Sequence, residues 1–142
     1  MKQLSIALVL VLGLVASAMA DTQTYETKVS NFTIDVPDGW KGKAIPDGCA
    51  VESADGANAI TVQFFPTNAM SAMDAAKMMA KSAQMNITSE KSEGGAVFLD
   101  GDKNGTPMGV LMVKTEKVLM AVLLAGKDRE TMMQIYNTIK SK

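Results

Sequence analysis

The chain contains no histidine, and Cys49 is its only cysteine. Histidine is the usual general base near neutral pH and the partner that activates a catalytic cysteine, so its absence removes the commonest acid–base and thiol catalysts. A single cysteine also excludes an intrachain disulfide. The sequence therefore predicts a protein that is held together by packing, that uses no cofactor and that is not an enzyme.

The chain also lacks an excess of charge of either sign. The 142 residues carry 14 Lys and Arg against 15 Asp and Glu, a formal net charge of −1, and the two signs are interleaved along the chain. Such a balance provides no basic patch for nucleic acid or for an anionic membrane surface. No internal repeat or low-complexity segment is present. We therefore expect one globular domain with no nucleic-acid partner.

The longest apolar run lies at the N-terminus. Lys2 precedes a run from residue 4 to residue 16, and Ala18-Met19-Ala20 provides small residues before Asp21. This arrangement is typical of a cleaved secretory signal, and the run is shorter than the ~20 residues of a membrane span. A lipid anchor would need a cysteine at the position of Asp21. We predict a signal peptide over residues 1–20 and a bacterial, periplasmic or secreted domain over residues 21–142 that does not insert into the membrane.

Apolar residues alternate in several short segments after the predicted signal. Two strands are predicted over 25–29 and 32–36, and a second pair over 49–53 and 59–65, which Pro66 ends. Further strands are predicted over 96–99, 109–114 and 118–125. Whether residues 86–91 form one more short strand stays open. The segment 118–125 is apolar at every position, which predicts that both of its faces are covered.

Two helices are predicted among these strands. Ser71 with Asp74 three residues later is a helix-start pattern, and alanines recur after it at helical spacing on a face that suits close packing on a sheet. Asp128 is predicted to cap a C-terminal helix with a buried stripe of Met132, Ile135, Tyr136 and Ile139. The predicted fold class is α+β, an antiparallel sheet of about six or seven strands with two main helices packed on it.

The order of elements and one segment carry a family resemblance. Phe32-Thr33-Ile34-Asp35-Val36-Pro37-Asp38-Gly39-Trp40 comes before a strand pair, a helix, a late hairpin and a C-terminal helix. This resembles the PsbP-like fold, including the bacterial periplasmic DcrB-like proteins, over about residues 24–142. The resemblance implies a domain that docks to larger assemblies, with a protein or envelope component as its partner. It implies no catalytic residue, because the family shares no catalytic motif that this sequence matches.

One loop carries half of a calcium-binding pattern. Asp100, Asp102 and Asn104 provide oxygen ligands at alternate positions, and Gly105 stands at the sixth position, where a tight wrap around the ion is needed. The twelfth position is Leu111 instead of the Glu that closes the calcium shell. The alternative is a polar hairpin loop in which Asn104-Gly105 forms the turn.

Methionine is unusually frequent, with twelve in the chain. Met70, Met73, Met78, Met79 and Met85 fall within one short stretch. Three interpretations stay open: adaptable core packing, an adaptable partner-binding surface, or a thioether site for copper(I). The sequence thus predicts a secreted or periplasmic, non-catalytic binding domain, with an extracytoplasmic calcium or copper(I) protein as the alternative.

Overall fold

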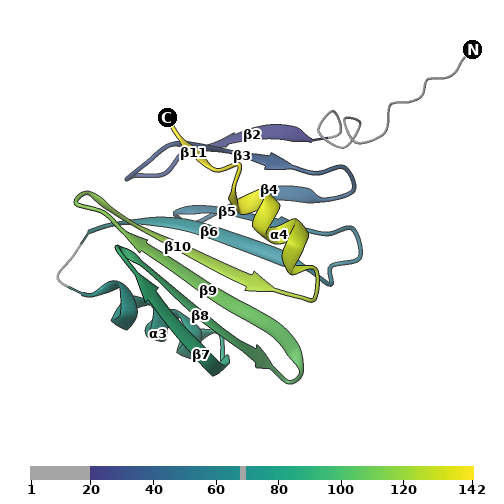
Figure 1. Cartoon of the computed structure of the whole chain (residues 1–142). Helices are drawn as coiled ribbons and strands as arrows, with labels where there is room; N and C mark the ends of the chain where they lie inside the picture. The colour runs from purple at the N-terminus through teal and green to yellow at the C-terminus, as the bar shows by residue number, and fades with distance from the viewer. Residues whose placement is uncertain (1–19, 68–69) are drawn as a thin grey trace, which may run out of the picture.

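The computed structural model describes residues 20–67 and 70–142. The predicted signal peptide lies outside these residues, except for Ala20. In chain order the elements are β2 (Asp21–Tyr25), β3 (Phe32–Val36), β4 (Lys41–Ile45), β5 (Gly48–Glu52), β6 (Ala59–Pro66), α3 (Ala72–Ser82), β7 (Asn86–Glu93), β8 (Ala96–Lys103), β9 (Thr106–Lys114), β10 (Val118–Ala125), α4 (Arg129–Tyr136) and β11 (Lys140–Ser141), as Figure 1 shows.

A seven-stranded antiparallel sheet forms the centre of the protein. Its strand order is β4-β5-β6-β10-β9-β8-β7, so the late strand β10 lies between β6 and β9. Val122 of β10 lies opposite Val62 on one side and Leu111 on the other. Because side chains alternate between the faces of a strand, β10 supplies apolar residues to both faces of the sheet. The prediction that both faces of 118–125 are covered is confirmed.

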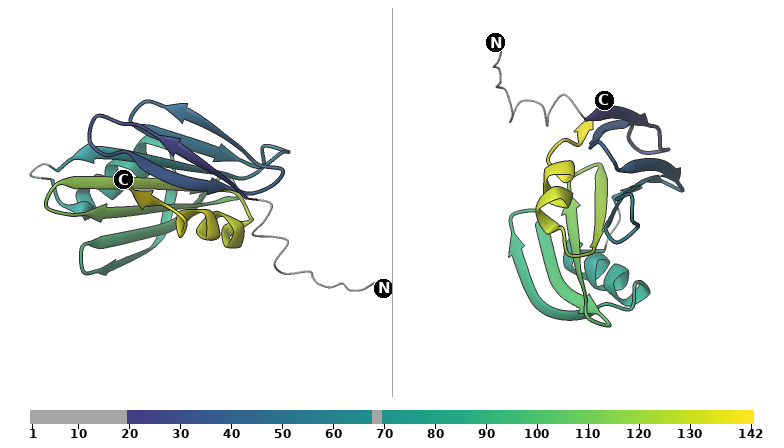
Figure 2. Two further views of the ribbon diagram at one scale, coloured as in Figure 1. Left: turned by 90° about the horizontal axis from the view of Figure 1, so that it is seen from above. Right: turned by 90° about the vertical axis from the view of Figure 1, so that its right-hand side faces the viewer.

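One face of the sheet is covered by a small sheet and by α4. The small sheet has the order β11-β3-β2, and α4 packs beside it (Figure 2). Between these elements and the large sheet lies the first core, in which aromatic, β-branched and other large apolar side chains predominate. Its buried residues are Phe32, Ile34, Val36, Cys49, Val51, Ile60, Val62, Phe64, Val122, Leu124, Met132 and Ile135.

The opposite face is covered by α3, which packs on β7, β8 and β9 (Figure 2). Here the second core forms from alanines and methionines of several segments together with branched residues of the strands. Its buried residues are Ala75, Ala76, Ala80, Met85, Val97, Leu99, Met108, Val110, Met112, Leu119 and Ala121. Among the described residues no helix is long and apolar enough to cross a membrane; α3, the longest, has 11 residues.

The α+β class and the two capped helices are confirmed. The Ser71 hydroxyl accepts a hydrogen bond from the Asp74 amide at 3.0 Å, and the Asp128 carboxylate accepts one from the Thr131 amide at 3.1 Å. Each bond satisfies a backbone donor that the first turn of a helix leaves free.

Three details differ from the predicted arrangement. The two strands nearest the N-terminus form a separate small sheet with β11 instead of joining the large one, and the first of them covers Asp21–Tyr25, so that only Tyr25 of the predicted strand 25–29 lies in it. The edge strand β4 is not predicted, because Lys41-Gly42-Lys43-Ala44-Ile45 has no apolar alternation. The C-terminal helix ends at Tyr136, so Ile139 contacts the first core from the segment between α4 and β11.

Candidate binding groove

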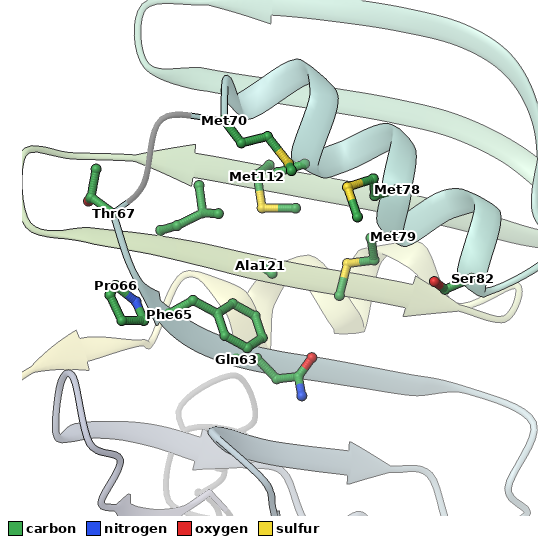
Figure 3. Close-up of a pocket in the computed structure, with 12 residues that line it drawn as sticks. Gln63, Phe65, Pro66, Thr67, Met70, Met78, Met79, Ser82, Met112 and Ala121 are labelled. Atoms are coloured by element: carbon green, nitrogen blue, oxygen red, sulfur yellow. The ribbon is translucent and has the colours of Figure 1, made fainter.

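An apolar groove of about 660 Å³ lies beside α3, on the face of the large sheet that holds the second core. Figure 3 shows α3 along one side of the groove and the strands β6 and β10 beneath it. None of the described residues that line it carries a charged side chain. The lining residues are Gln63, Phe65, Pro66, Thr67, Met70, Ala75, Met78, Met79, Ser82, Met112, Leu119 and Ala121. We call this site the methionine groove.

The groove exists because α3 covers only part of its face of the sheet. Small side chains, Ala75, Ala76 and Ala80, let the helix lie close to the strands β7, β8 and β9. The helix is short, and its contacts reach β7, β8 and β9, so part of β6 and β10 on this face stays open to the groove. The side chains of Phe65 and Leu119 therefore line the groove beside the helix.

Hydrogen bonds to backbone carbonyls hold the end of the groove where the chain passes from β6 towards α3. The Thr67 amide donates to the Lys117 carbonyl at 3.2 Å, and the Thr67 hydroxyl donates to the Thr115 carbonyl at 2.9 Å. The Lys114 ammonium donates to the Met70 carbonyl at 2.7 Å. These bonds attach both sides of this connection to the turn between β9 and β10, and so fix where Met70 enters the groove.

The methionine stretch of the sequence divides between groove and core. Met70, Met78 and Met79 line the groove, and Met78 is the one large apolar side chain among residues 20–67 and 70–142 that is exposed, at 57%. Met85 instead belongs to the second core and Met73 packs against it, and neither residue lines the groove. The spacing of α3 explains this division, because residues 75, 78, 79 and 82 share one side of a helix whereas residue 73 lies elsewhere.

The sequence patterns do not predict the part of the groove that the sheet supplies. Met112 comes from β9, and Phe65, Leu119 and Ala121 come from β6 and β10. Met112 is distant from the methionine stretch in sequence, and the packing of α3 on β9 brings it beside the helix. The sequence signal for these residues is the alternation of side chains along each strand, which places Met112 and Val110 on the same face of β9.

The predicted calcium loop forms the end of the β8–β9 hairpin. Lys103 pairs with Thr106, and the two residues between them, Asn104 and Gly105, have φ angles of 52° and 86°. Positive φ at both central positions is the mark of a tight two-residue hairpin turn. The Asp102 carboxylate accepts hydrogen bonds from the Gly105 amide at 3.0 Å and from the Asn86 side chain at 3.3 Å.

Asp100, the first of the three predicted calcium ligands, faces α4. Its Oδ1 lies 3.1 Å from an Nη of Arg129, whose guanidinium stands 5.5 Å from the centre of the Phe98 ring. Among residues 20–67 and 70–142, no three His, Cys, Asp or Glu side chains gather closely enough to hold a metal ion. The hydrogen bonds of this loop account for its sequence as a hairpin, and calcium binding there stays a prediction.

Cys49 lies in the first core with no exposed surface. Burial raises the pKa of its thiol to about 12, because an apolar surrounding disfavours the charged thiolate. A neutral, buried thiol behaves as a small apolar side chain. The sulfur would reach another chain only if the first core opened.

No protein-family model matches the chain, and no curated protein sequence matches it. Among solved structures, the solution structure of the cyanobacterial PsbP, CyanoP, from Synechocystis sp. PCC 6803 is similar over 87% of this chain and 94% of that chain, with a TM-score of 0.55 and 14% sequence identity. A crystal structure from Bacteroides thetaiotaomicron VPI-5482 covers 78% of this chain and 45% of that chain, with a TM-score of 0.48 and 15% identity. The resemblance noted in the sequence is therefore confirmed for the fold: the chain has a PsbP-like α+β architecture.

Proposed function

We propose that this protein is an extracytoplasmic, non-catalytic binding domain that receives an apolar segment of a partner protein in the methionine groove. One observation carries the proposal: an open apolar groove with the exposed side chain of Met78 at its edge. Exposing such a surface to water costs free energy, and contiguous exposed apolar surface commonly marks an interaction site.

The chemistry of the lining favours a peptide as the occupant. Methionine has three rotatable bonds and a polarisable sulfur, so a methionine surface adapts to apolar side chains of different shapes. Gln63, Thr67 and Ser82 add polar groups among the lining residues, where the amides of a bound backbone need hydrogen-bond partners. The Gln63 side chain is itself held by a 3.0 Å hydrogen bond to the Pro46 carbonyl.

The non-catalytic part of the proposal rests on the residue types that are present. The whole chain has no histidine, and its one thiol is buried and kept neutral on the far face of the sheet. The groove itself is lined by apolar and uncharged polar side chains. Such a lining suits the binding of an apolar segment better than it suits proton transfer, which needs a titratable group at the reacting atoms.

Site-specific photo-crosslinking tests the binding proposal. A photoreactive phenylalanine at position 78 should crosslink a protein in cells of the source organism, because Met78 lies at the groove. The same residue at position 91 is the control, since Lys91 is exposed on β7 and pairs with Phe98, whose ring lies on the α4 side of the sheet. Crosslinking at both positions alike, or at neither, would contradict the proposal.

The captured protein then needs a direct binding measurement. Purified partner should bind the purified domain, and Met78→Asp should weaken that binding because a charge enters an apolar interface. The matched change Lys91→Asp should leave it unaltered. Reproducible turnover of a small molecule by the domain would overturn the non-catalytic part of the proposal.

The extracytoplasmic location is tested separately. We expect the protein to be released by osmotic shock, and its intact mass should correspond to a chain that begins at Asp21. A full-length chain that stays in the cytoplasmic fraction would contradict the proposed location and would leave the binding proposal unaffected.

A further inference from the structure

Four methionine thioethers from three separate segments meet at the methionine groove. Met70 comes from the chain before α3, Met78 and Met79 from α3, and Met112 from β9. Figure 3 shows their side chains reaching into the same space between the helix and the sheet. The fold thus brings together sulfur atoms that lie more than 40 residues apart in the sequence.

These side chains range from fully covered to open. Met112 is 2% exposed, Met70 and Met79 are partly buried against the second core, and Met78 is 57% exposed. An ion could therefore enter past Met78 and be held by the sulfurs nearer the sheet. Each methionine side chain turns about three bonds, which lets the sulfurs of this lining adjust their positions around an ion.

The chemistry of the donors decides which ion fits. Thioether sulfur is a soft, uncharged ligand that selects copper(I), whereas zinc, copper(II), calcium and magnesium need imidazole, thiolate or carboxylate groups. The chain has no histidine, Cys49 lies in the first core on the opposite face, and no carboxylate belongs to the lining. A monovalent ion also costs less than a divalent one to place among uncharged groups.

We propose that Met70, Met78, Met79 and Met112 form a thioether site that binds one copper(I) ion. The site goes beyond the binding of a partner segment, because it depends on the four sulfur atoms and not on the apolar shape of the groove. Leucine separates the two properties, since it keeps the volume and the apolar character of methionine but offers no ligand.

Methyl NMR of the otherwise unaltered chain gives the first test, with silver(I) as a redox-inert substitute for copper(I). In a Cys49→Ala background, which removes the one thiol, silver(I) should shift the ε-methyl signals of Met70, Met78, Met79 and Met112. The signals of the other methionines should stay in place. Equal shifts for all methionines, or no shift at all, would overturn the proposal. This test requires no substitution in the groove.

Copper(I) affinity gives the second test. Under anaerobic conditions the domain should withdraw copper(I) from a coloured chelator until one ion is bound per chain. Replacing Met70, Met78, Met79 and Met112 together by leucine should abolish this withdrawal. The matched control is Met120→Leu with Met133→Leu, since both residues are partly buried against the first core. Equal copper binding by the two variants would contradict the assignment.

The same leucine variants distinguish the two proposals from each other. If the four-leucine variant still binds the partner but not copper(I), both proposals stand as separate properties of one groove. If wild-type protein binds copper(I) and no partner is captured at position 78, the partner proposal fails alone. Circular dichroism should confirm that the variant is folded, and the methyl NMR result stands in any case because it needs no change in the groove.

Discussion

The two cores of this protein share one sheet but are built differently. Phe32, Ile34 and Phe64 represent the first core, in which aromatic and branched side chains are enclosed between two sheets and α4. Ala76, Met85 and Met112 represent the second, in which the short helix α3 covers only part of one face of the sheet. Aromatic and β-branched side chains adopt few rotamers, whereas methionine adopts many. The first core is therefore specific in shape, and the second is adaptable and open at one side.

The difference between the two cores indicates where a ligand can bind without destabilising the domain. The ring centre of Phe32 lies 4.9 Å from that of Phe64 and 5.8 Å from that of Tyr25, so aromatic rings fill this part of the first core. The second core reaches the surface along the methionine groove. A site that must adapt to an occupant belongs on the side whose residues can repack, and the stability of the domain then rests on the other side.

Two methionines of equal burial give the sharpest test of the comparison. Met132 of the first core is 0% exposed, and Met112 of the second is 2% exposed. Replacement of a buried methionine by alanine costs about 2–5 kcal/mol, depending on how far the site can collapse. We expect Met132→Ala near the upper end, because its neighbours are rigid, and Met112→Ala near the lower end, because the groove side chains can move in. Urea unfolding measures both.

Equal costs for the two substitutions would show that the cores do not differ in adaptability. Met112→Leu is the control for shape, and it should cost less than about 1.5 kcal/mol because it conserves volume. A larger loss for Met112→Leu than for Met112→Ala would contradict the interpretation of the second core as adaptable.

The pH dependence of stability tests whether the first core is closed to water. Burial raises the pKa of the Cys49 thiol to about 12, whereas an unfolded thiol ionises near pH 8.5. The unfolded state therefore releases a proton first, so the stabilising contribution is complete below about pH 8.5 and falls as the pH rises towards 12. Urea unfolding across this range should show a steeper decline for the natural chain than for Cys49→Ala.

Thiol reactivity gives an independent readout of the same closure. A thiol-specific reagent such as dithionitrobenzoate should not react with Cys49 in the native protein at pH 8, and should react fully in urea. Rapid reaction of the native protein, or parallel pH profiles for the two chains, would mean that the first core opens readily.

The helix caps compare the coverings of the two faces. Ser71→Ala removes the side-chain bond at the start of α3, and Asp128→Ala removes the corresponding bond at the start of α4. Each loss should cost about 1 kcal/mol. Only Ser71→Ala should also weaken binding at the groove, because α3 carries Met78 and Met79. Thermal unfolding and copper(I) competition on both variants measure this, and equal effects on binding would contradict it.

Much of the fold follows from local patterns in the sequence. Alternation predicts β3 and β6, an unbroken apolar run predicts β10, and Ser71 and Asp128 predict the helix starts, because these signals arise within a few residues. The edge strand β4 gives no such signal, since Lys41 and Lys43 on an edge are compatible with solvent. The separate small sheet could not be predicted, because the pairing of β11 with β3 joins the two ends of the domain.

The groove was predictable only in part, for the same reason. Met70, Met78 and Met79 are close in sequence and marked an unusual composition. Met112 joins them through strand order, and Phe65 and Leu119 face the groove because α3 ends its coverage at β9. A sequence pattern shows which residues share a face, but the extent of a helix over a sheet depends on packing across the whole layer.

The smallest expected effect concerns the ion pair that joins α4 to the large sheet. Arg129 and Asp100 are 3.1 Å apart, with side chains 30% and 44% exposed, so water screens much of their attraction. We expect Asp100→Asn to cost no more than about 1 kcal/mol, and the cost should shrink at high salt. Methionine-groove binding should not change, because the pair lies on the opposite face of β8 from Leu99 and the second core.

The same substitution also separates the hairpin interpretation of residues 100–105 from the calcium prediction. Calcium is added to the chelator-treated domain in a calorimeter. If the loop is only a hairpin, neither the natural chain nor Asp100→Asn should give heat of binding, and Asp102 and Gly105 keep their turn contact in both. Heat on addition of calcium that Asp100→Asn removes would instead assign the loop to a cation. That outcome would place a second binding region on the rigid side of the protein, where the comparison of the two cores predicts none.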